Sequence, residues 1–323
     1  MSTGRPETQP RLIADIGGTN ARLALVEPGS LDYALLARLH TADFDGLAPL
    51  IEKALTDYAG PPPREALCAI ASPIDHDTVT LTNAGWRFSI RDTQARLKLE
   101  RLTVINDWVA QGWAIPALGR QHLATLQPGT APADAPRLAL GPGTGLGSAL
   151  VIPQDGDWQV FPTEGGHISF GPANAREAAI VAAIQARYGH CSAERMASGR
   201  GLQAIHAALR TLAGDDGPEV HAETIGHAAV AGDPLAREAV YTLLAALAST
   251  AGDLALATGA RGGLYLGGGL IPALNDWFDP AAFLARFRAK GRFRDYLAAI
   301  PVHRIQHEAP ALLGLARYLN RTS

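Results

Sequence analysis

The stretch Leu12-Ile-Ala-Asp-Ile-Gly-Gly-Thr-Asn-Ala-Arg-Leu-Ala-Leu-Val26 decides the fold of this chain. Leu12–Ile16 and Ala21–Val26 are apolar runs of strand length, and a glycine-containing connection between such runs is typical of a β-hairpin. Glycine also lets a backbone approach an anion closely, and successive N–H groups with a threonine hydroxyl can bind a phosphate. The stretch therefore predicts a hairpin whose turn is a candidate phosphate site, formed by Gly17, Gly18, Thr19 and Asn20.

A second stretch, Leu138-Ala-Leu-Gly-Pro-Gly-Thr-Gly-Leu-Gly-Ser-Ala-Leu-Val-Ile152, follows the same plan of apolar run, Gly/Thr turn and apolar run. We interpret the two stretches as an internal repeat. Two such turns, the second at Gly143, Thr144 and Gly145, suit a nucleotide whose phosphates lie between two domains. Either turn alone is equally well explained as an ordinary hairpin, but their duplication in matched contexts favours the phosphate interpretation.

Composition excludes several classes of protein. A chain of 323 residues predicts two domains, and 47% apolar with 18% charged residues favours a compact globule over disorder. A formal net charge of -3 lacks the basic balance of a dedicated nucleic-acid binder. The lysines are Lys53, Lys98 and Lys290, and none follows a glycine, so a Gly-Lys-Ser/Thr phosphate loop is excluded. Any nucleotide is therefore bound in another way.

Cysteine content and hydropathy predict the compartment. Cys68 and Cys191 are too few for a disulfide framework or a four-cysteine zinc site, which favours free thiols in a reducing compartment. Met1–Arg11 is polar, and we expect no signal peptide there. No run of about 18 uncharged apolar residues occurs, so the sequence predicts a soluble, cytoplasmic protein that does not enter a membrane.

Capping and breaker residues predict helices. Asn174 and Glu177 have the spacing of a capping box, and Asp233-Pro234 is a favourable N-cap pair. The predicted helices are Leu47–Tyr58, Trp108–Ile115, Asn174–Tyr188, Asp233–Gly259 and Ala311–Leu319. Further strands are predicted at Ala66–Ala71, Thr78–Leu81, Leu102–Ile105 and Gly263–Leu266. Residues 126–137, rich in proline and alanine, are either a linker or a surface loop.

Three polar residues near strand ends, two with a carboxylate and one with an amide side chain, are candidate site residues. Asn106 and Asp107 directly follow the predicted strand Leu102–Ile105. A carboxylate there can accept the proton of a hydroxyl that attacks a phosphoryl group, although a helix N-cap is the commoner role of such a pair. Asp15 precedes the first glycine turn and cannot itself bind an anion, so it suits Mg²⁺ bound through water.

Glu164-Gly-Gly-His167 places a carboxylate and an imidazole three residues apart. A polyol ligand needs several such donors and acceptors that converge at fixed directions, although a lone histidine is more often a structural or a surface residue. Glu194 follows in His190-Cys-Ser-Ala-Glu-Arg195, where a surface ion pair with Arg195 is the default explanation. That segment lacks zinc-site spacing. The glycines of 141–147 do not fit the dinucleotide fingerprint Gly-x-Gly-x-x-Gly.

Taken in order from Leu12 to Leu319, these segments resemble the ATP-dependent glucokinases of the proteobacterial type, within the sugar kinase, actin and heat-shock chaperone ATPase superfamily. The motifs that carry the resemblance are Asp15-Ile-Gly-Gly-Thr-Asn-Ala-Arg22, Ile105-Asn-Asp107, Gly141-Pro-Gly-Thr-Gly-Leu-Gly147, Glu164-Gly-Gly-His167, Gly189-His-Cys-Ser-Ala-Glu-Arg195 and Gly267-Gly-Gly269. The resemblance implies an α/β, two-domain, actin-like (ribonuclease H-like) fold with a cleft between the domains. Residues 11–117 and 308–323 would form a small α/β domain and 118–307 a large one, after a flexible tail at 1–10. The final helix would then pack on the first domain.

The resemblance also implies an activity: transfer of the ATP γ-phosphoryl group to the 6-hydroxyl of glucose, giving glucose 6-phosphate and ADP for glycolysis. Asp107 would be the general base, and the other glucose hydroxyls would contact Asn106, Glu164, His167 and Glu194. ATP phosphates would be bound at Gly17–Asn20 and Gly143–Gly145, with the adenosine against Gly267, Gly268 and Gly269 and Mg²⁺ near Asp15. The family suggests a homodimer.

Two departures and two alternatives accompany this hypothesis. Pro142 removes one N–H beside the second turn, where relatives commonly have small residues. The chain also lacks the zinc-binding cysteines of the related repressor and open-reading-frame kinase (ROK) family, which favours the zinc-free branch. The alternatives are a sugar-sensing regulator that retains the glucose site and a kinase for another hexose. Direct DNA binding is disfavoured because only about eleven residues precede the first strand, too few for a helix-turn-helix domain.

Overall fold

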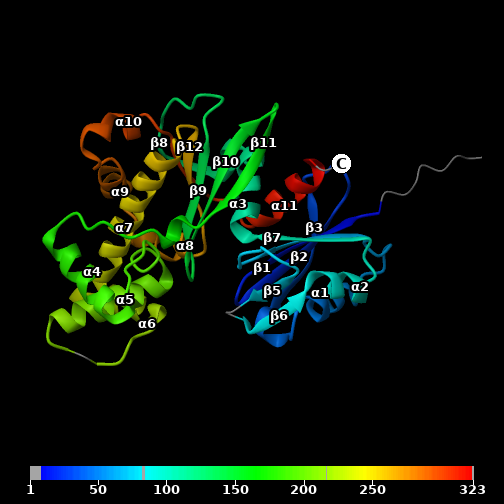
Figure 1. The fold of residues 1–323 in the computed structure, drawn as a ribbon, viewed down its shortest axis with the longest axis horizontal. Coiled ribbons are helices and arrows are strands. Elements are labelled where there is room, and N and C mark those ends of the chain that lie inside the picture. Colours follow the sequence, from blue (N-terminus) through cyan, green and yellow to red (C-terminus); the bar gives the residue numbers. More distant parts are fainter. Residues whose placement is uncertain (1–8, 82–83, 216, 322–323) are drawn as a thin grey trace, which may run out of the picture. The chain divides into compact units, whose positions relative to one another are not determined.

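The structure, a computed structural model, describes residues 9–81, 84–215 and 217–321. It divides into two compact units (Figure 1). Unit 1 comprises the chain up to Gly119, Trp158–Pro162 and the chain from His307; unit 2 comprises Arg120–Asp157 and Thr163–Gln306. Residues 1–8 of the predicted tail, and 322–323 of the predicted small domain, lie outside the described residues.

Unit 1 is built on a mixed sheet of five strands in its described part, in the order β3-β2-β1-β4-β7. The strands are β1 (Arg11–Ile16), β2 (Asn20–Val26), β3 (Tyr33–His40), β4 (Glu65–Ile70) and β7 (Arg101–Asn106). β1 pairs antiparallel with β2, which confirms the predicted hairpin, and parallel with β4, which in turn is parallel to β7. A separate hairpin joins β5 (Thr78–Leu81) to β6 (Trp86–Ser89).

Alternation along β1 explains why both faces of this sheet are covered. Leu12 and Ile16 pack into one hydrophobic cluster with α1 (Leu47–Leu55), whereas Ile13 packs into a second cluster with α11 (Pro310–Arg321). Figure 1 shows α1 and α2 (Ile90–Arg96) on one side of the sheet, and α3 (Asp107–Ala114) with α11 on the other. The prediction that the final helix packs on the first part of the chain is confirmed.

Helices α3 and α11 approach each other so closely that one residue must be glycine. A Cβ on Gly314 would overlap the carbonyl oxygen of Ala110 and lie 2.8 Å from the nitrogen of Ala114. The two backbones are therefore in direct contact where the helices cross.

Unit 2 repeats the topology of unit 1. Its described part contains a sheet of six strands in the order β11-β10-β9-β12-β13-β8. These are β8 (Leu123–Gln127), β9 (Arg137–Pro142), β10 (Leu146–Gln154), β11 (Asp157–Thr163), β12 (Gly263–Leu266) and β13 (Val302–Ile305). The edge strand β11 belongs to this sheet, although its middle residues, Trp158–Pro162, are counted with unit 1. β9 pairs antiparallel with β10 and parallel with β12, just as β1 pairs with β2 and β4. The internal repeat predicted from the two glycine stretches is therefore a repeat of strand topology, to which unit 2 adds β8.

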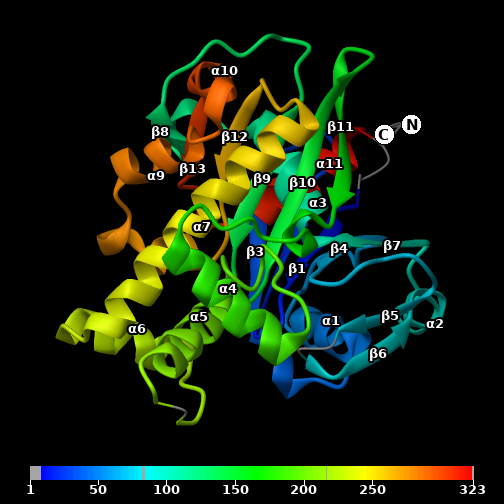
Figure 2. The ribbon, with the colours of Figure 1, turned by 60° about the vertical axis from the view of Figure 1, so that its left-hand side comes forward.

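The helices of unit 2 gather around one long core helix, as Figure 2 shows. They are α4 (Ala175–Tyr188), α5 (Gly199–Leu212), α6 (Ala222–Ala231), α7 (Pro234–Thr258), α8 (Leu270–Ala273), α9 (Pro280–Phe287) and α10 (Arg294–Ala298). The predicted caps are confirmed: Asn174 Oδ1 accepts the Glu177 N–H at 2.8 Å, and Asp233 Oδ1 accepts the Ala236 N–H at 2.7 Å. By length and composition α7 could cross a membrane, but 72% of its most apolar window is buried inside the protein. It is the core helix of unit 2.

The structure differs from the sequence-based expectations in a few places. The helix predicted over Leu47–Tyr58 ends at Leu55, although Tyr58 still packs against the same cluster. Residues 126–137 are no linker: Gln127 is buried in β8, and the Thr130 N–H donates to the Ala299 carbonyl at 3.2 Å. The segment is thus a surface loop fastened to unit 2.

Replacing Gly314 by alanine is expected to lower the free energy of unfolding by about 2 kcal/mol, because a methyl group must be forced between two packed helices. Gly226 of α6 is the matched control, since a Cβ there meets nothing within 4 Å. Gly226→Ala should stabilise by up to about 1 kcal/mol, the ordinary helix preference for alanine. Urea denaturation of both variants checks this, and equal effects would contradict the close crossing.

Candidate active site

The predicted site residues of unit 1 lie at one edge of its sheet. The parallel register places Ile16 beside Ile70 and Ile70 beside Asn106. Neighbouring strands are about 4.8 Å apart, so the residues that follow β1 and β7 lie roughly 10 Å from each other at their carboxyl ends. This is the edge at which α/β sheets bind ligands. The first glycine turn and Asp107, distant in sequence, therefore share it.

The first turn, Gly17–Asn20, uses one of its own N–H groups to close. The Gly17 N–H donates to the Asn20 carbonyl at 3.0 Å, and the Thr41 hydroxyl donates to the Gly17 carbonyl at 2.9 Å. Within the described chain, the N–H groups of Gly18 and Thr19 have no hydrogen-bond acceptor. Of the backbone groups in the turn, these two are the ones able to bind an anion.

Asp15 lies beside Arg22 across the hairpin, with 3.5 Å between Oδ2 and Nη1. Burial raises the pKa of Asp15 above its ordinary value, and the Arg22 guanidinium opposes that shift. A carboxylate oxygen suits Mg²⁺, which typically takes one or two carboxylates and completes its shell with water and substrate phosphates. Among the residues that the structure describes, no three or more His, Cys, Asp or Glu side chains form a metal cluster. The donor chemistry of Asp15 fits a Mg²⁺ that arrives with a nucleotide.

Asn106 and Asp107 begin α3, and the cap interpretation is confirmed for Asn106. Its Oδ1 accepts the Trp108 N–H at 2.9 Å, and its Nδ2 donates to the Ser72 carbonyl at 3.2 Å. Asp107 follows in the first turn, where the helix dipole favours a negative charge, and its Oδ1 accepts the same N–H at 3.0 Å. The cap thus fixes the backbone from which the Asp107 carboxylate projects.

The second turn, Gly143–Gly145, is one residue shorter than the first, and hydrogen bonds from within the turn and from the start of α5 fix it. Pro142 pairs with Leu146 across the hairpin, and the Gly143 N–H donates to the Gly145 carbonyl at 2.7 Å. The Gly199 N–H, at the start of α5, donates to the Gly143 carbonyl at 2.9 Å. The N–H groups of Thr144 and Gly145 have no acceptor within the described residues, which parallels Gly18 and Thr19 in unit 1.

The third glycine segment, Gly267–Gly269, lies directly against the second turn's strand. The Gly267 N–H donates to the Leu140 carbonyl at 3.0 Å. Gly268 has φ +89°, and a Cβ there would lie 2.5 Å from the Pro142 carbonyl oxygen. Gly269 precedes α8 as its N-cap. The structure therefore brings together, within unit 2, two segments that the sequence predicts to bind one nucleotide.

Glu164, His167 and Glu194 come together on two adjacent segments of unit 2. Glu164 Oε2 lies 3.7 Å from His167 Nε2, and both side chains are mostly exposed. The Glu194 N–H donates to the Gly166 carbonyl at 2.8 Å, which places the two segments side by side. A Cβ on Gly166 would overlap the Leu146 carbonyl oxygen, so the glycine lets this segment press against β10.

The surface ion pair first considered for Glu194 is wrong. The Arg195 guanidinium lies over the Tyr188 ring, 3.9 Å from its centroid, and makes no ion pair with Glu194 in the described structure. Instead Glu194 Oε2 accepts the Leu146 N–H at 3.0 Å, directly after the second turn.

Two supporting hydroxyls were not anticipated from the sequence. Thr41 holds the first turn, and Ser198 Oγ donates to the Glu194 carbonyl at 2.8 Å while it accepts the Gly201 N–H as the N-cap of α5. The Ser198-Gly199 pair before a helix is the sequence signal that could have found the second of these.

Comparison with known proteins decides the family. The sequence model of the Glucokinase family matches residues 12–322. The glucokinase of Chromobacterium violaceum is 42% identical over 99% of this chain and 92% of its own length. This chain belongs to the glucokinase family. The resemblance seen in the sequence motifs is thereby confirmed.

Solved structures agree with membership of the glucokinase family. A glucokinase from an Antarctic psychrotroph superposes with a TM-score of 0.83 at 31% identity, over 97% of this chain and 99% of that one. A ROK family glucokinase from Streptomyces griseus, solved with glucose and AMPPNP, shares the fold with a TM-score of 0.63 at 21% identity, over 98% of this chain and 100% of its own. The predicted α/β actin-like ATPase fold is confirmed.

In this glucokinase-family chain both thiols are expected to be unreactive. Burial raises the pKa of Cys68 to about 12 and that of Cys191 to about 11, although Arg195 opposes the shift of Cys191. A thiol with a pKa near 11 is only about 0.1% thiolate at pH 8, and the thiolate is the reactive form. Ellman's reagent at pH 8 should label the native protein slowly and the unfolded protein at once. The variant Ala59→Cys, which places a thiol at an exposed position, is the positive control. Rapid labelling of both thiols in the native wild type would contradict this burial.

Proposed function

We propose that the protein is a glucokinase (EC 2.7.1.2), which transfers the γ-phosphoryl group of ATP to the 6-hydroxyl of glucose and releases glucose 6-phosphate and ADP. The observation that carries the proposal is the family match over residues 12–322, a span that includes both glycine turns and all the candidate site residues. The Streptomyces griseus structure supports the ligand classes, because that protein was solved with glucose and with AMPPNP, an ATP analogue.

We assign the roles of the residues as the family motifs imply. Asp107 acts as general base on the 6-hydroxyl, and the remaining hydroxyls bind Asn106, Glu164, His167 and Glu194. Because the Asn106 side chain already caps α3 and binds Ser72, we expect it to offer a sugar only its remaining amide hydrogen and carbonyl lone pair. The adenosine lies against Gly267–Gly269.

The proposed mechanism is an in-line transfer in which the protein mainly positions groups and stabilises charge. The N–H groups of Gly18, Thr19, Thr144 and Gly145 are the backbone donors that their turns leave available for phosphate oxygens. Asp107 accepts the hydroxyl proton late in the transfer, when the hydroxyl has become acidic. Mg²⁺, bound by ATP phosphates and through water by Asp15, would supply neutralisation of the developing charge. Pro142 removes no donor from the turn itself, because it lies in β9.

Sugar selectivity follows from hydrogen-bonding groups that a wrong sugar leaves unpaired. A site built to bind a hydroxyl strongly rejects an analogue that lacks it. A coupled assay of ADP release over a panel of hexoses tests this and separates glucokinase from a kinase of another hexose. Glucose binding with no turnover of any sugar would instead support the sugar-sensing regulator.

We further propose that the protein is a cytoplasmic homodimer without nucleic-acid or membrane partners. The sequence-based boundaries at 117/118 and 307/308 remain our proposal for its two domains. Size-exclusion chromatography with light scattering tests the dimer.

Asp107→Asn is expected to lower kcat by about 10²–10⁴-fold, because it removes the proton acceptor. The Kd for glucose, measured by calorimetry, should change by less than about threefold. Asp92→Asn is the matched control, since Asp92 also lies in the first turn of a helix of unit 1. Near-normal turnover of Asp107→Asn would remove this residue from the catalytic role.

Glu164→Gln and His167→Ala are each expected to raise the Kd for glucose by about tenfold or more, because each loses a charged or aromatic hydrogen-bonding partner of the sugar. The AMPPNP affinity without sugar should stay close to that of the wild type. Glu223→Gln on the exposed start of α6 serves as the control. An unchanged glucose affinity in both variants would exclude the Glu-Gly-Gly-His segment from the sugar site.

A further inference from the structure

Glu194 contacts two functional segments at once. Its Oε2 accepts the Leu146 N–H at 3.0 Å, directly after the second glycine turn, and its own N–H donates to the Gly166 carbonyl at 2.8 Å in the Glu-Gly-Gly-His segment. Its other carboxylate oxygen, Oε1, has no hydrogen-bond partner within the described chain. One residue thus joins the turn assigned to ATP phosphates, through its side chain, to the segment assigned to the sugar, through its backbone.

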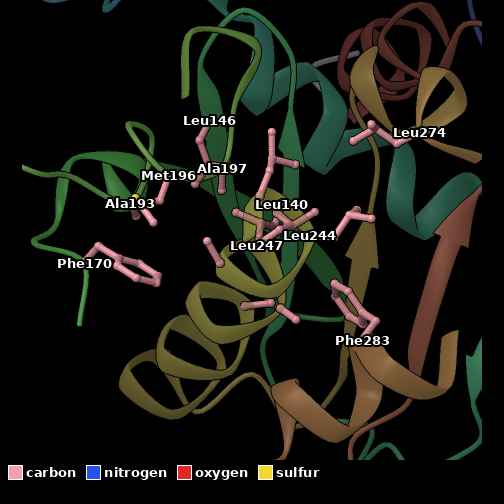
Figure 3. Packing of buried hydrophobic residues seen from close by; sticks show 14 of the residues in the cluster. Leu140, Leu146, Phe170, Ala193, Met196, Ala197, Leu244, Leu247, Leu274 and Phe283 are labelled. Atoms are coloured by element: carbon pink, nitrogen blue, oxygen red, sulfur yellow. The ribbon is translucent and has the colours of Figure 1, made fainter. Parts of the chain in front are cut away.

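The backbone that carries Glu194 is held rigidly. Its neighbours Ala193, Met196 and Ala197 are buried, and Figure 3 shows them beside Leu146 in the core of unit 2. The Glu194 carbonyl accepts the Ser198 hydroxyl at 2.8 Å. Because this backbone is packed in the core, a change at the carboxylate acts on the turn through the hydrogen bond between Oε2 and the Leu146 N–H.

The turn is shaped to admit this carboxylate. A Cβ on Gly145 would overlap Glu194 Oε2 and lie 3.2 Å from Cδ. A Cβ on Gly143 meets nothing within 4 Å, and neither glycine has a φ in the left-handed region between +20° and +160°. The requirement for glycine at position 145 therefore comes from Glu194 and not from backbone strain.

The negative charge of Glu194 determines whether the contact favours or opposes nucleotide binding. A carboxylate beside a turn that binds phosphates repels the incoming nucleotide. Sugar hydroxyls that donate to Oε1 stabilise and disperse that negative charge, and they hold the carboxylate in the position that keeps the Leu146 N–H bonded. Both effects favour nucleotide binding once sugar is present.

We propose that Glu194 is a positioning residue through which bound sugar raises the affinity of the second glycine turn for the nucleotide phosphates. This inference rests on the proposed function, which assigns Glu194 to the sugar and Gly143–Gly145 to ATP. Because coupling between two sites is reciprocal, the nucleotide raises the affinity for sugar by the same factor.

The test is calorimetry of AMPPNP binding to the full-length protein with Mg²⁺, without glucose and at saturating glucose. In the wild type glucose should lower the AMPPNP Kd by about tenfold, and AMPPNP should lower the glucose Kd by the same factor. Gly145→Ala should reduce the factor below about twofold, because the methyl group displaces the carboxylate. Gly143→Ala is the matched control: its coupling factor should remain near tenfold even where its affinity for AMPPNP falls.

Glu194→Gln provides a second readout that a purely structural role would not move. Without sugar it should bind AMPPNP several-fold more tightly than the wild type, because the repelling charge is gone, and glucose raised to saturation should add less than twofold. A coupling factor that stays near tenfold in Gly145→Ala and Glu194→Gln would overturn the proposal. If the wild type binds both ligands but neither ligand changes the Kd of the other, the proposal is overturned and the proposed function still stands. If the wild type does not bind glucose, both are overturned.

Discussion

Parallel pairing beside the first strand of each repeat is the constraint on which the rest of the structure depends. β4 pairs parallel with β1 in unit 1, and β12 pairs parallel with β9 in unit 2. Parallel strands end at the same edge, so whatever follows them is brought together regardless of separation in sequence. Gly17 and Asp107 lie at one such edge in unit 1, and Gly143 and Gly267 lie at the corresponding edge in unit 2. The candidate site is therefore a consequence of strand order.

Glycine has two different uses in this chain. At Gly18 and Thr19, and at Thr144 and Gly145, the turns leave backbone N–H groups without acceptors in the described structure, which suits an anion. At Gly166, Gly268 and Gly314 any residue with a Cβ is excluded, because a backbone oxygen of another segment lies where the Cβ would be. The second use decides how close the Glu-Gly-Gly-His segment lies to β10 and how closely α3 crosses α11. The two glycines of the Glu-Gly-Gly-His segment are thus buried and closely packed in the fold.

The composition of the central helix α7 would allow it to cross a membrane, but its burial shows that it is a core helix. Its alanines and leucines would suit a lipid environment as well as a protein core. In unit 2 these side chains meet the sheet and the surrounding helices, and Figure 3 shows Leu244 and Leu247 packed beside Leu140. The helix therefore forms the core around which the segments that we propose to bind sugar and nucleotide in unit 2 are arranged.

Sequence alone determined the hairpins, the capped helices, the repeat and the family, because these depend on local patterns: apolar runs, Asn174 and Asp233 at N-caps, and motifs in a fixed order. It also singled out Glu194, but it could not tell a surface ion pair from a sugar ligand. Only the tertiary structure decided that Arg195 turns to Tyr188 and that Glu194 bonds the Leu146 N–H. Likewise it showed that the N–H groups of Gly17 and Gly143 close their own turns. Those outcomes depend on which backbone groups remain unpaired after packing, and packing partners lie far apart in the sequence.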